Sequence, residues 1–263
     1  MISLTFDDAL DQHLDTVIEL LDRYELPGTF YAHLSADSFF QRRDEWRAAA
    51  ERGHEIGGHT VFHPADHRKN WVSHGNAIDY YSPDRMRLEL QLANRYLSSV
   101  DGCNDRTFAY PCSNPVIGDY GLLCRSLFRI GLRNTRIPGM VERSRLDFGN
   151  TRFEYSPIVA KQYFAARSGG LHLDMASPSV DGLDRYHLPS AAVNEHSFIQ
   201  MRHFIERSLE AGGWPILQFH GIGGGHHMDC DRTEFEKLVT WLGHHHRELV
   251  ATVFSVSRSL FSS

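Results

Sequence analysis

Short apolar runs alternate with amphipathic segments along almost the whole chain. Runs rich in β-branched and aromatic residues predict strands at 2–6, 29–33, 54–57, 107–110, 214–219 and 249–254. Apolar residues at helical spacing predict helices at 11–24, 42–52, 83–99, 118–130, 197–211 and 232–242. Residues 156–166 fit a helix, or a helix followed by a strand, and 64–82 are typical of a long loop. The pattern at 138–155 predicts no regular element.

This alternation of strands and helices predicts a parallel sheet with crossover helices, which is an α/β fold. About seven such units in 263 residues fit a closed or nearly closed (β/α) barrel. A doubly wound open sheet is the alternative, but no glycine-rich phosphate loop follows a predicted strand. No internal repeat or linker marks a second unit, so residues 1–263 are expected to form a single domain.

Composition and charge narrow the possible partners and locations. The formal net charge is −6, whereas proteins that bind nucleic acid or anionic membranes usually carry a basic stripe, so no nucleic-acid partner is expected. No apolar run approaches the roughly 18–20 residues of a membrane span. No signal peptide is visible, which predicts a cytoplasmic protein, or a secreted or periplasmic one if the sequence is a trimmed form. The four cysteines form no C-x-x-C pair and are expected to be free thiols.

Polar residues with catalytic potential follow several of the predicted strands. Asp7 and Asp8 end the first strand, His59 follows the third, the step from Tyr110 to Pro111 follows the fourth, and His220 follows the run at 214–219. In a parallel barrel the carboxyl ends of all strands meet at one rim, where the chemistry takes place. These distant segments are therefore expected to converge on one site.

The spacing of two histidines indicates a metal site. His59 and His63 lie four residues apart, so one helical turn would place both imidazoles on the same side. With Asp8 as a third ligand they make an incomplete zinc shell that leaves room for water, the pattern of a catalytic site. Asp7 would then be free to move a proton. For the aspartate pair alone, the alternative is a strand end followed by a helix N-cap.

The other histidine-rich segments are less specific. His220 precedes a glycine run that would let backbone or substrate come close, and His is the usual proton donor near neutral pH. His226 and His227 follow that run within reach of the pocket, but no role is assigned to them. The three consecutive histidines at 244–246 lie near a helix end among charged residues and are interpreted as solvated surface.

Taken together, these segments resemble the polysaccharide deacetylase family, carbohydrate esterase family four. The family's T-F-D-D motif is present at residues 5–8, and its H-[ST]-x-x-H-P motif at residues 59–64. Its last motif, a strand ending in an apolar residue and His, is present as L-Q-F-H at 217–220. The motifs occur in the family's order and span nearly the whole chain.

The resemblance implies a deformed (β/α) barrel of seven or eight strands with outer helices. It implies a divalent metal bound by Asp8, His59 and His63, with zinc preferred over cobalt, nickel, manganese or iron. It also implies Asp7 as general base and His220 as general acid. The turn at Tyr110 and Pro111 would contribute to substrate binding, and the backbone N–H of Cys112 would stabilise the oxyanion.

The chain departs from the commonest family pattern at the third motif. An arginine that usually holds the base is replaced by Ala109, and the segment F-A-Y-P at 108–111 resembles a known branch of the family. In such relatives a later arginine takes over, so Arg167 is expected to pair with Asp7, and Arg133 is the second candidate. The stretch from about 115 to 153 matches no family motif and is interpreted as an insertion that shapes the substrate groove.

The expected activity is metal-dependent removal of acetyl groups from an N-acetylated or O-acetylated sugar or polysaccharide. Aromatic residues in the loop at 64–82, namely Trp71, Tyr80 and Tyr81, favour a sugar because their faces suit ring stacking. Two alternatives stay open. The same scaffold could hydrolyse a C–N bond in a cyclic amide or ureide, or it could bind carbohydrate without catalysis. No oligomeric state is predicted.

Overall fold

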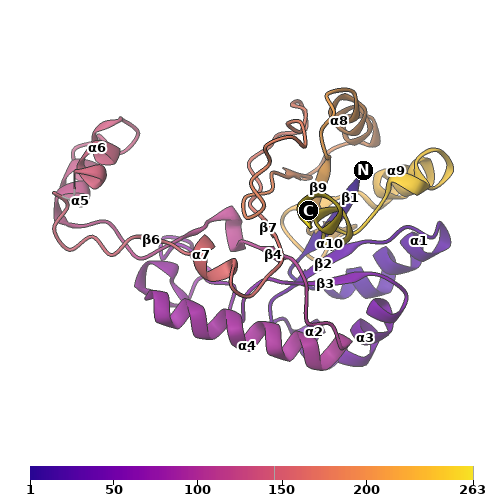
Figure 1. Cartoon of the computed structure of the whole chain (residues 1–263), viewed down its shortest axis with the longest axis horizontal. Helices are drawn as coiled ribbons and strands as arrows, with labels where there is room; N and C mark the ends of the chain where they lie inside the picture. Colours follow the sequence, from indigo (N-terminus) through magenta and orange to yellow (C-terminus); the bar gives the residue numbers. More distant parts are fainter. Residues whose placement is uncertain (145, 263) are drawn as a thin grey trace.

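The computed structural model describes residues 1–144 and 146–262 (Figure 1). Its strands are β1 Ser3–Asp7, β2 Thr29–Ala32, β3 Glu55–Gly58, β4 Phe108–Ala109, β5 Val116–Ile117, β6 Phe153–Glu154, β7 Ala166–Arg167, β8 Ala191–Ala192, β9 Ile216–Phe219, β10 Gly221–Ile222 and β11 Asp229–Cys230. Its α-helices are α1 Ile18–Arg23, α2 Asp37–Gln41, α3 Arg43–Glu51, α4 Pro83–Asp101, α5 Leu122–Arg129, α6 Ile137–Arg143, α7 Ser156–Val159, α8 Phe198–Glu210, α9 Arg232–His245 and α10 Val253–Phe261. Shorter helical turns are η1 His13–Val17, η2 His74–Asn76, η3 Ile78–Tyr80, η4 Pro111–Ser113 and η5 Arg247–Leu249.

A curled parallel sheet forms the centre of the molecule. Within the described residues it has seven strands in the order β7-β4-β3-β2-β1-β9-β8. Its two edges meet, because residues 188–190 form backbone hydrogen bonds with 166–169 while β8 pairs with β9. Helices cover the outside of the sheet (Figure 1). The predicted α/β fold, a deformed (β/α) barrel of parallel strands with outer helices, is confirmed, and it brings the carboxyl ends of the strands together.

The core fixes the ends of the three strands that matter most for the site. Phe6 of β1 stacks on Phe30 of β2 and on Phe219 of β9, with ring centroids 4.9 and 5.4 Å apart. All three rings are fully buried. Burying each such side chain contributes about 2–3 kcal/mol, so the register of the central strands is strongly defined. The residues that follow these rings therefore have fixed positions.

Two of the predicted helices begin where their capping residues indicate. The side chain of Ser82 accepts a hydrogen bond from the backbone of Arg85, and α4 runs from Pro83 to a left-handed Gly102. Ser197 forms a capping box with Gln200 at the start of α8. The helix expected at 11–24 is also present, but its first half is the π-helical turn η1. At 156–166, the alternative of a helix followed by a strand is the one observed, as α7 and β7.

The strand predicted at 249–254 is wrong. Val250 forms a single parallel bridge with Ile2, and the backbone groups of Leu249 and Ala251 hydrogen-bond to Ile2 on either side of it. Thr252 then caps α10 by accepting a hydrogen bond from the backbone of Ser255. The apolar run had a strand pattern, but a capping residue in its middle starts a helix instead.

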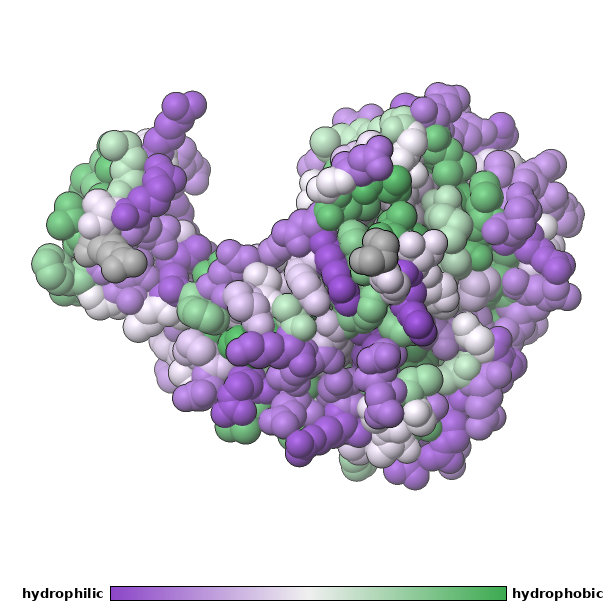
Figure 2. Space-filling model, viewed as in Figure 1, coloured by the Kyte–Doolittle hydropathy of each residue, from purple (hydrophilic) through white to green (hydrophobic). Residues whose placement is uncertain are grey.

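The segment from about 115 to 153 forms an arm that projects from the barrel (Figure 1). The antiparallel ribbon of β5 and β6 carries α5 and α6 at its end. The helix predicted at 118–130 is present as α5, whereas α6 and β6 lie partly in the stretch for which no element was predicted. Figure 2 shows a deep hollow between this arm and the rest of the molecule, and the side of the arm that faces it is hydrophilic. In the described part of the chain, no helix is long and apolar enough to cross a membrane.

Candidate active site

The backbone turns sharply where β1 ends. Asp8 and Ala9 have φ values of 76° and 50°, in the left-handed region that L-residues seldom adopt. This conformation costs about 1–2 kcal/mol per residue. The turn directs both carboxylates to the same rim, although neighbouring side chains of an extended strand point to opposite faces. The strain lies at Asp8 and Ala9, directly after Asp7, and such strain is typical of functional sites.

Asp7 is buried and paired with an arginine from the far side of the barrel. Arg167 Nη2 lies 2.6 Å from both carboxylate oxygens of Asp7, and Gln218 Nε2 donates a 3.0 Å hydrogen bond to Oδ2. Arg167 is held in turn by Ser190, whose Oγ lies 3.1 Å from Nη1. Burial raises the pKa of Asp7, but Arg167 and the histidines of the site outweigh it, so the pKa lies below its ordinary value. Asp7 is therefore an ionised carboxylate near neutral pH.

Arg133, the second candidate for this pairing, lies elsewhere. Its guanidinium group stacks over the ring of Phe128 at 4.7 Å, in the projecting arm. The barrel instead brings β7 beside β4, so that Arg167 reaches Asp7 across 160 positions of sequence. The sequence analysis ranked Arg167 ahead of Arg133, and Arg167 is the arginine that the structure places on Asp7.

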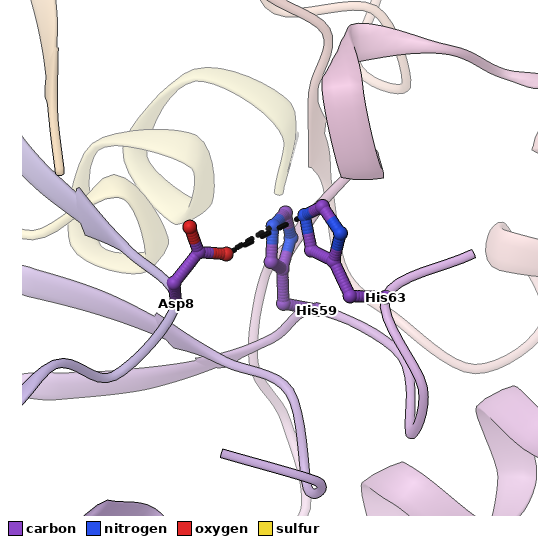
Figure 3. A group of neighbouring side chains, drawn as sticks. All are labelled: Asp8, His59 and His63. Atoms are coloured by element: carbon purple, nitrogen blue, oxygen red, sulfur yellow. Dashed lines mark ion pairs between the residues drawn. The ribbon is translucent and has the colours of Figure 1, made fainter. Parts of the chain in front are cut away.

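Asp8, His59 and His63 form a compact cluster (Figure 3). Asp8 Oδ1 lies 3.5 Å from His59 Nε2 and 3.4 Å from His63 Nε2. Oxygen and nitrogen ligands around one tetrahedral zinc ion are about 3.4 Å apart, given metal–ligand distances of about 2.0–2.1 Å. Asp8 Oδ1 is also buried without a hydrogen-bond partner among the described residues. These side chains therefore fit a divalent metal ion.

Contacts behind the cluster orient its ligands. His59 Nδ1 lies 2.8 Å from the carbonyl oxygen of Ala109, so Nδ1 carries the proton and the Nε2 lone pair points to Asp8 and His63. His63 does not follow His59 on a helical turn, as the spacing suggested. The chain bends instead, with φ values of 70° at Thr60 and 49° at His63. Thr60 Oγ1 accepts a 3.0 Å hydrogen bond from the backbone N–H of His63.

Glu89 of α4 fixes the middle of this bend. Its Oε1 accepts hydrogen bonds from the backbone N–H groups of Val61 and Phe62, both at 3.1 Å. Glu89 is nearly fully buried, and a buried carboxylate without such donors would be costly. A glutamate on the apolar face of an otherwise regular amphipathic helix was the sequence signal for this role, and it was missed.

The charge states of the cluster suit metal binding. Burial opposes ionisation of Asp8, but the neighbouring His59 and His63 hold its pKa well below the usual range. Burial and the nearby His59 lower the pKa of His63 to about 3. For His59, burial lowers the pKa, but the two aspartates raise it by more. The ionised Asp8 and the neutral His63 are therefore in the states that bind metals, whereas a metal ion competes with a proton at His59.

His220 lies at the same rim, beside a second histidine. His220 Nε2 is 3.8 Å from Asp7 Oδ2, and its ring stacks on His226 with centroids 4.7 Å apart. His226 Nε2 lies 3.8 Å from Asp8 Oδ2, so this histidine does reach the pocket. Burial lowers the pKa of His220, although both aspartates oppose the shift. Behind it, the buried His13 lies with Nε2 2.8 Å from the His220 carbonyl oxygen.

The turn after β4 presents the predicted oxyanion group. Tyr110 and Pro111 are buried, whereas Cys112 is exposed and has a φ of 52°. Among the backbone hydrogen bonds of the described residues, none uses the N–H of Cys112. The turn packs against the chain after β7, because a Cβ on Gly169 would come within 2.3 Å of Ser113 Oγ. It therefore lies beside the segment that carries Arg167.

Gln218 is a further contact that the sequence analysis missed. It is a polar residue inside the apolar strand β9, and its side chain is bonded both to Asp7 and to Ser190. A polar residue in a run of large apolar ones was the available signal. Trp71, from the loop at 64–82, lies with its ring 5.5 Å from that of His63 and is half exposed.

The fold and the site define a barrel protein with a candidate metal-binding cluster at the rim of its parallel sheet. Residues 1–116 match the family described as polysaccharide deacetylase, which confirms the resemblance. The matched residues are fewer than half of the 263 in the chain. The match contains the first two motifs and the F-A-Y-P segment, but the assignment to the F-A-Y-P branch stays a prediction, as do the individual roles of the site residues.

The fold is shared with several solved structures at low sequence identity. A protein from Mycobacterium smegmatis described as a polysaccharide deacetylase is 13% identical, with 99% of this chain and 90% of that chain covered and a TM-score of 0.61. The Bc1960 peptidoglycan N-acetylglucosamine deacetylase is 13% identical, with coverage of 100% and 88% and a TM-score of 0.54. A family 4 acetyl xylan esterase from Clostridium thermocellum, solved with a cobalt ion, is 15% identical, with coverage of 99% and 90% and a TM-score of 0.50.

A gellan lyase from Bacillus sp is similar in sequence to part of the chain. It is 28% identical over 135 residues, which is 50% of this chain. The chain spans only 5% of the length of that relative.

Proposed function

We propose that the protein is a metal-dependent deacetylase that hydrolyses acetyl groups of an N-acetylated or O-acetylated sugar within a glycan. The observation that carries this proposal is the pairing of two sets of side chains at one rim. Asp8, His59 and His63 form a metal-binding cluster, and the ionised Asp7 lies next to it, held by Arg167. A metal site alone would indicate only that the protein binds a ligand. A separate, oriented base beside the metal ligands indicates hydrolysis.

The three ligands leave at least one position of a divalent ion open, and zinc suits two imidazoles and a carboxylate best. When bound there, such an ion would polarise the acetyl carbonyl and acidify a water molecule. The presence of cobalt in the acetyl xylan esterase structure supports a divalent metal in this fold. Cobalt, nickel, manganese and iron are therefore worth testing beside zinc.

The side chains around the cluster have distinct proposed roles. Asp7 accepts the proton of the attacking water, and Arg167 keeps this carboxylate ionised and oriented. The N–H of Cys112, which makes no backbone hydrogen bond within the described residues, stabilises the negative charge that develops on the carbonyl oxygen. His220, 3.8 Å from Asp7, protonates the leaving amine or hydroxyl group.

A sugar is the substrate that fits the surroundings best. Trp71 offers a half-exposed aromatic face beside His63, and such faces stack on sugar rings. Relatives of this fold are described as acting on peptidoglycan N-acetylglucosamine and on acetyl xylan, which supports both N-acetyl and O-acetyl groups as targets.

The direct test is acetate release from acetylated chito-oligosaccharides and acetylated xylan. We expect a chelator to abolish release and zinc to restore it. Asp8→Asn should lower metal affinity, whereas Asp7→Asn should keep the metal and lose turnover. If chelated protein stayed fully active, or if both variants bound metal and turned over normally, the proposal would be wrong. Cleavage of cyclic ureides but of no acetylated sugar would favour the C–N hydrolase, and glycan binding without product would favour a binding barrel.

A further inference from the structure

A cavity of about 700 Å³ lies between the projecting arm and the loop at 64–82, outside the metal-binding cluster. One wall comes from the arm, between Gly118 and Asn134 and at Arg152, and the other from residues 66–68 and 78–80. The hydrophilic side of the arm faces the hollow of the molecule (Figure 2). This cavity plays no part in the proposed hydrolysis, so its chemistry needs a separate explanation.

The arm is basic in an acidic protein. Residues 118–152 contain seven arginines and no lysine against three aspartates and glutamates, a formal net charge of +4 in a chain whose net charge is −6. The remainder of the chain therefore repels anions, whereas the arm attracts them. A local field of this kind steers an anionic ligand to one part of the surface.

Within the cavity, most charged side chains neutralise each other. Arg125 pairs with Asp119 at 2.8 Å, and Arg152 pairs with Glu142 at 2.8 Å. Arg68 also pairs with Asp66 in the lining, and His67 Nδ1 lies 3.2 Å from Asp79 Oδ2, a contact that is an ion pair only when His67 is protonated.

Two arginines are left over. Arg129 and Arg133 line the same cavity, and in the described part of the chain no carboxylate lies within 4.0 Å of either guanidinium group. Both side chains are exposed to solvent, so they are available to a ligand. The cavity therefore offers two uncompensated cations.

The lining also provides aromatic faces. Arg133 is stacked on Phe128, and Arg152 on Tyr120 at 4.1 Å, which restricts both guanidinium groups. Tyr80 is half exposed at the opposite wall. Aromatic rings suit sugar rings, and the planar arginine fork suits a carboxylate. A sugar that carries a carboxylate group matches this combination.

The cavity adjoins the proposed catalytic rim. Asp66 follows His63 by three residues, which limits the distance between their Cα atoms to about 11 Å. Asn114 follows Cys112 by two residues, which limits the distance between their Cα atoms to about 8 Å. Both Asp66 and Asn114 line the cavity. One oligosaccharide could therefore occupy the cavity and the metal-binding cluster at once.

We propose that this cavity is a subsite for a glycan that carries carboxylate groups, so that a charged sugar unit lies beside the unit whose acetyl group is removed. This inference rests on the proposed deacetylase function for the second unit. The binding of the charged unit does not depend on the metal or on turnover, and this difference allows the two proposals to be tested separately.

The test compares two probes by isothermal titration calorimetry with the full chain. A hyaluronan hexasaccharide alternates N-acetylglucosamine with glucuronate, whereas chitohexaose is neutral. We expect hyaluronan to bind more tightly, and Arg129→Gln/Arg133→Gln to weaken its binding about fivefold or more, as loss of two exposed ion pairs would. Raising salt from about 0.05 M to about 0.3 M should weaken wild-type binding and affect the variant less. Binding of chitohexaose should not change.

Matched variants separate a specific subsite from general attraction. Arg136→Gln/Arg143→Gln removes the same charge from the same arm at exposed positions that do not line the cavity, so hyaluronan binding should change less than about twofold. Equal losses of hyaluronan affinity in both double variants would overturn the subsite proposal. Equal affinity of the wild-type protein for hyaluronan and chitohexaose would overturn it as well. Metal-free protein should still bind hyaluronan more tightly than chitohexaose, and Arg129→Gln/Arg133→Gln should remove this preference. If no acetylated substrate were turned over while this binding persisted, only the deacetylase proposal would fail.

Discussion

The buried pair of Arg167 and Asp7 allows a quantitative test of how the site is held together. Both side chains are almost completely buried, with 1% and 3% of their surfaces exposed. Arg167→Met would leave the Asp7 carboxylate with Gln218 as its remaining hydrogen-bond donor. Removing one partner of a buried ion pair typically costs about 3–5 kcal/mol, because the other charge stays unpaired. We expect a loss of this size in the free energy of unfolding.

The double variant should recover much of that loss. In Arg167→Met/Asp7→Asn neither position carries a charge, so we expect the free energy of unfolding to return to within about 2 kcal/mol of wild type. The matched control is Arg68→Met, which breaks the ion pair with Asp66. This pair is more exposed than that of Arg167 and Asp7, so its loss should lower the free energy of unfolding by less than about 1 kcal/mol. Turnover should be low in every variant that lacks Asp7 or Arg167.

Urea denaturation followed by circular dichroism, in the presence of a chelator, measures these differences without a contribution from metal binding. A loss below about 1 kcal/mol for Arg167→Met would refute the reasoning. So would a double variant that is less stable than Arg167→Met, because the two side chains would then not be coupled.

Two further predictions concern the supports behind the site. His13 Nδ1 accepts a hydrogen bond from the backbone N–H of Leu10, and burial lowers the pKa of His13 to about 4. The folded protein therefore favours neutral His13. The stability that depends on neutral His13 is complete above pH 6.5 and is lost as the pH falls to 4. The free energy of unfolding of chelated wild-type protein should fall by about 3 kcal/mol over that pH range because of this group, whereas His13→Gln should lack this contribution. Parallel curves of unfolding free energy against pH for the two proteins would contradict the assignment. Glu89→Leu should lower the free energy of unfolding by about 2–4 kcal/mol and weaken zinc binding, because the N–H groups of Val61 and Phe62 lose their acceptor. Glu89→Gln keeps an acceptor and should keep most of both properties. Competition with a zinc-binding dye measures the affinity, and equal effects of the two Glu89 substitutions would show that the hydrogen bonds are unimportant.

Much of the framework could be predicted because local chemistry and tertiary structure agree there. The apolar residues of β1 lead directly into Asp7 and Asp8, and Ser82 and Ser197 start helices in the way their side chains favour. Prediction failed where local patterns were ambiguous. Residues 249–254 have the apolar character of a strand, but Thr252 caps a helix within the run.

The site itself was only partly predictable. Its ligands could be proposed because His59 and His63 follow a strand end at a recognisable spacing. The bend between them was not predicted, since it depends on Glu89 from a distant helix. Gln218 was missed although it is a polar residue in an apolar strand, and His226 was left unassigned, because their partners Asp7 and Asp8 lie more than 200 residues away in the chain.

By itself, the sequence determined which chemical groups are available and which strand ends carry them, because apolar strand runs and helix caps are local properties of the sequence. Only the tertiary structure decided that Ser190 and Gln218 hold the pair of Arg167 and Asp7. It also decided that Arg129 and Arg133 lack carboxylate partners within the described residues, whereas Arg125 and Arg152 have them. The physical reason is that pairing depends on distances of a few ångströms between residues far apart in the chain, and these distances are set by how the barrel closes and where the arm projects.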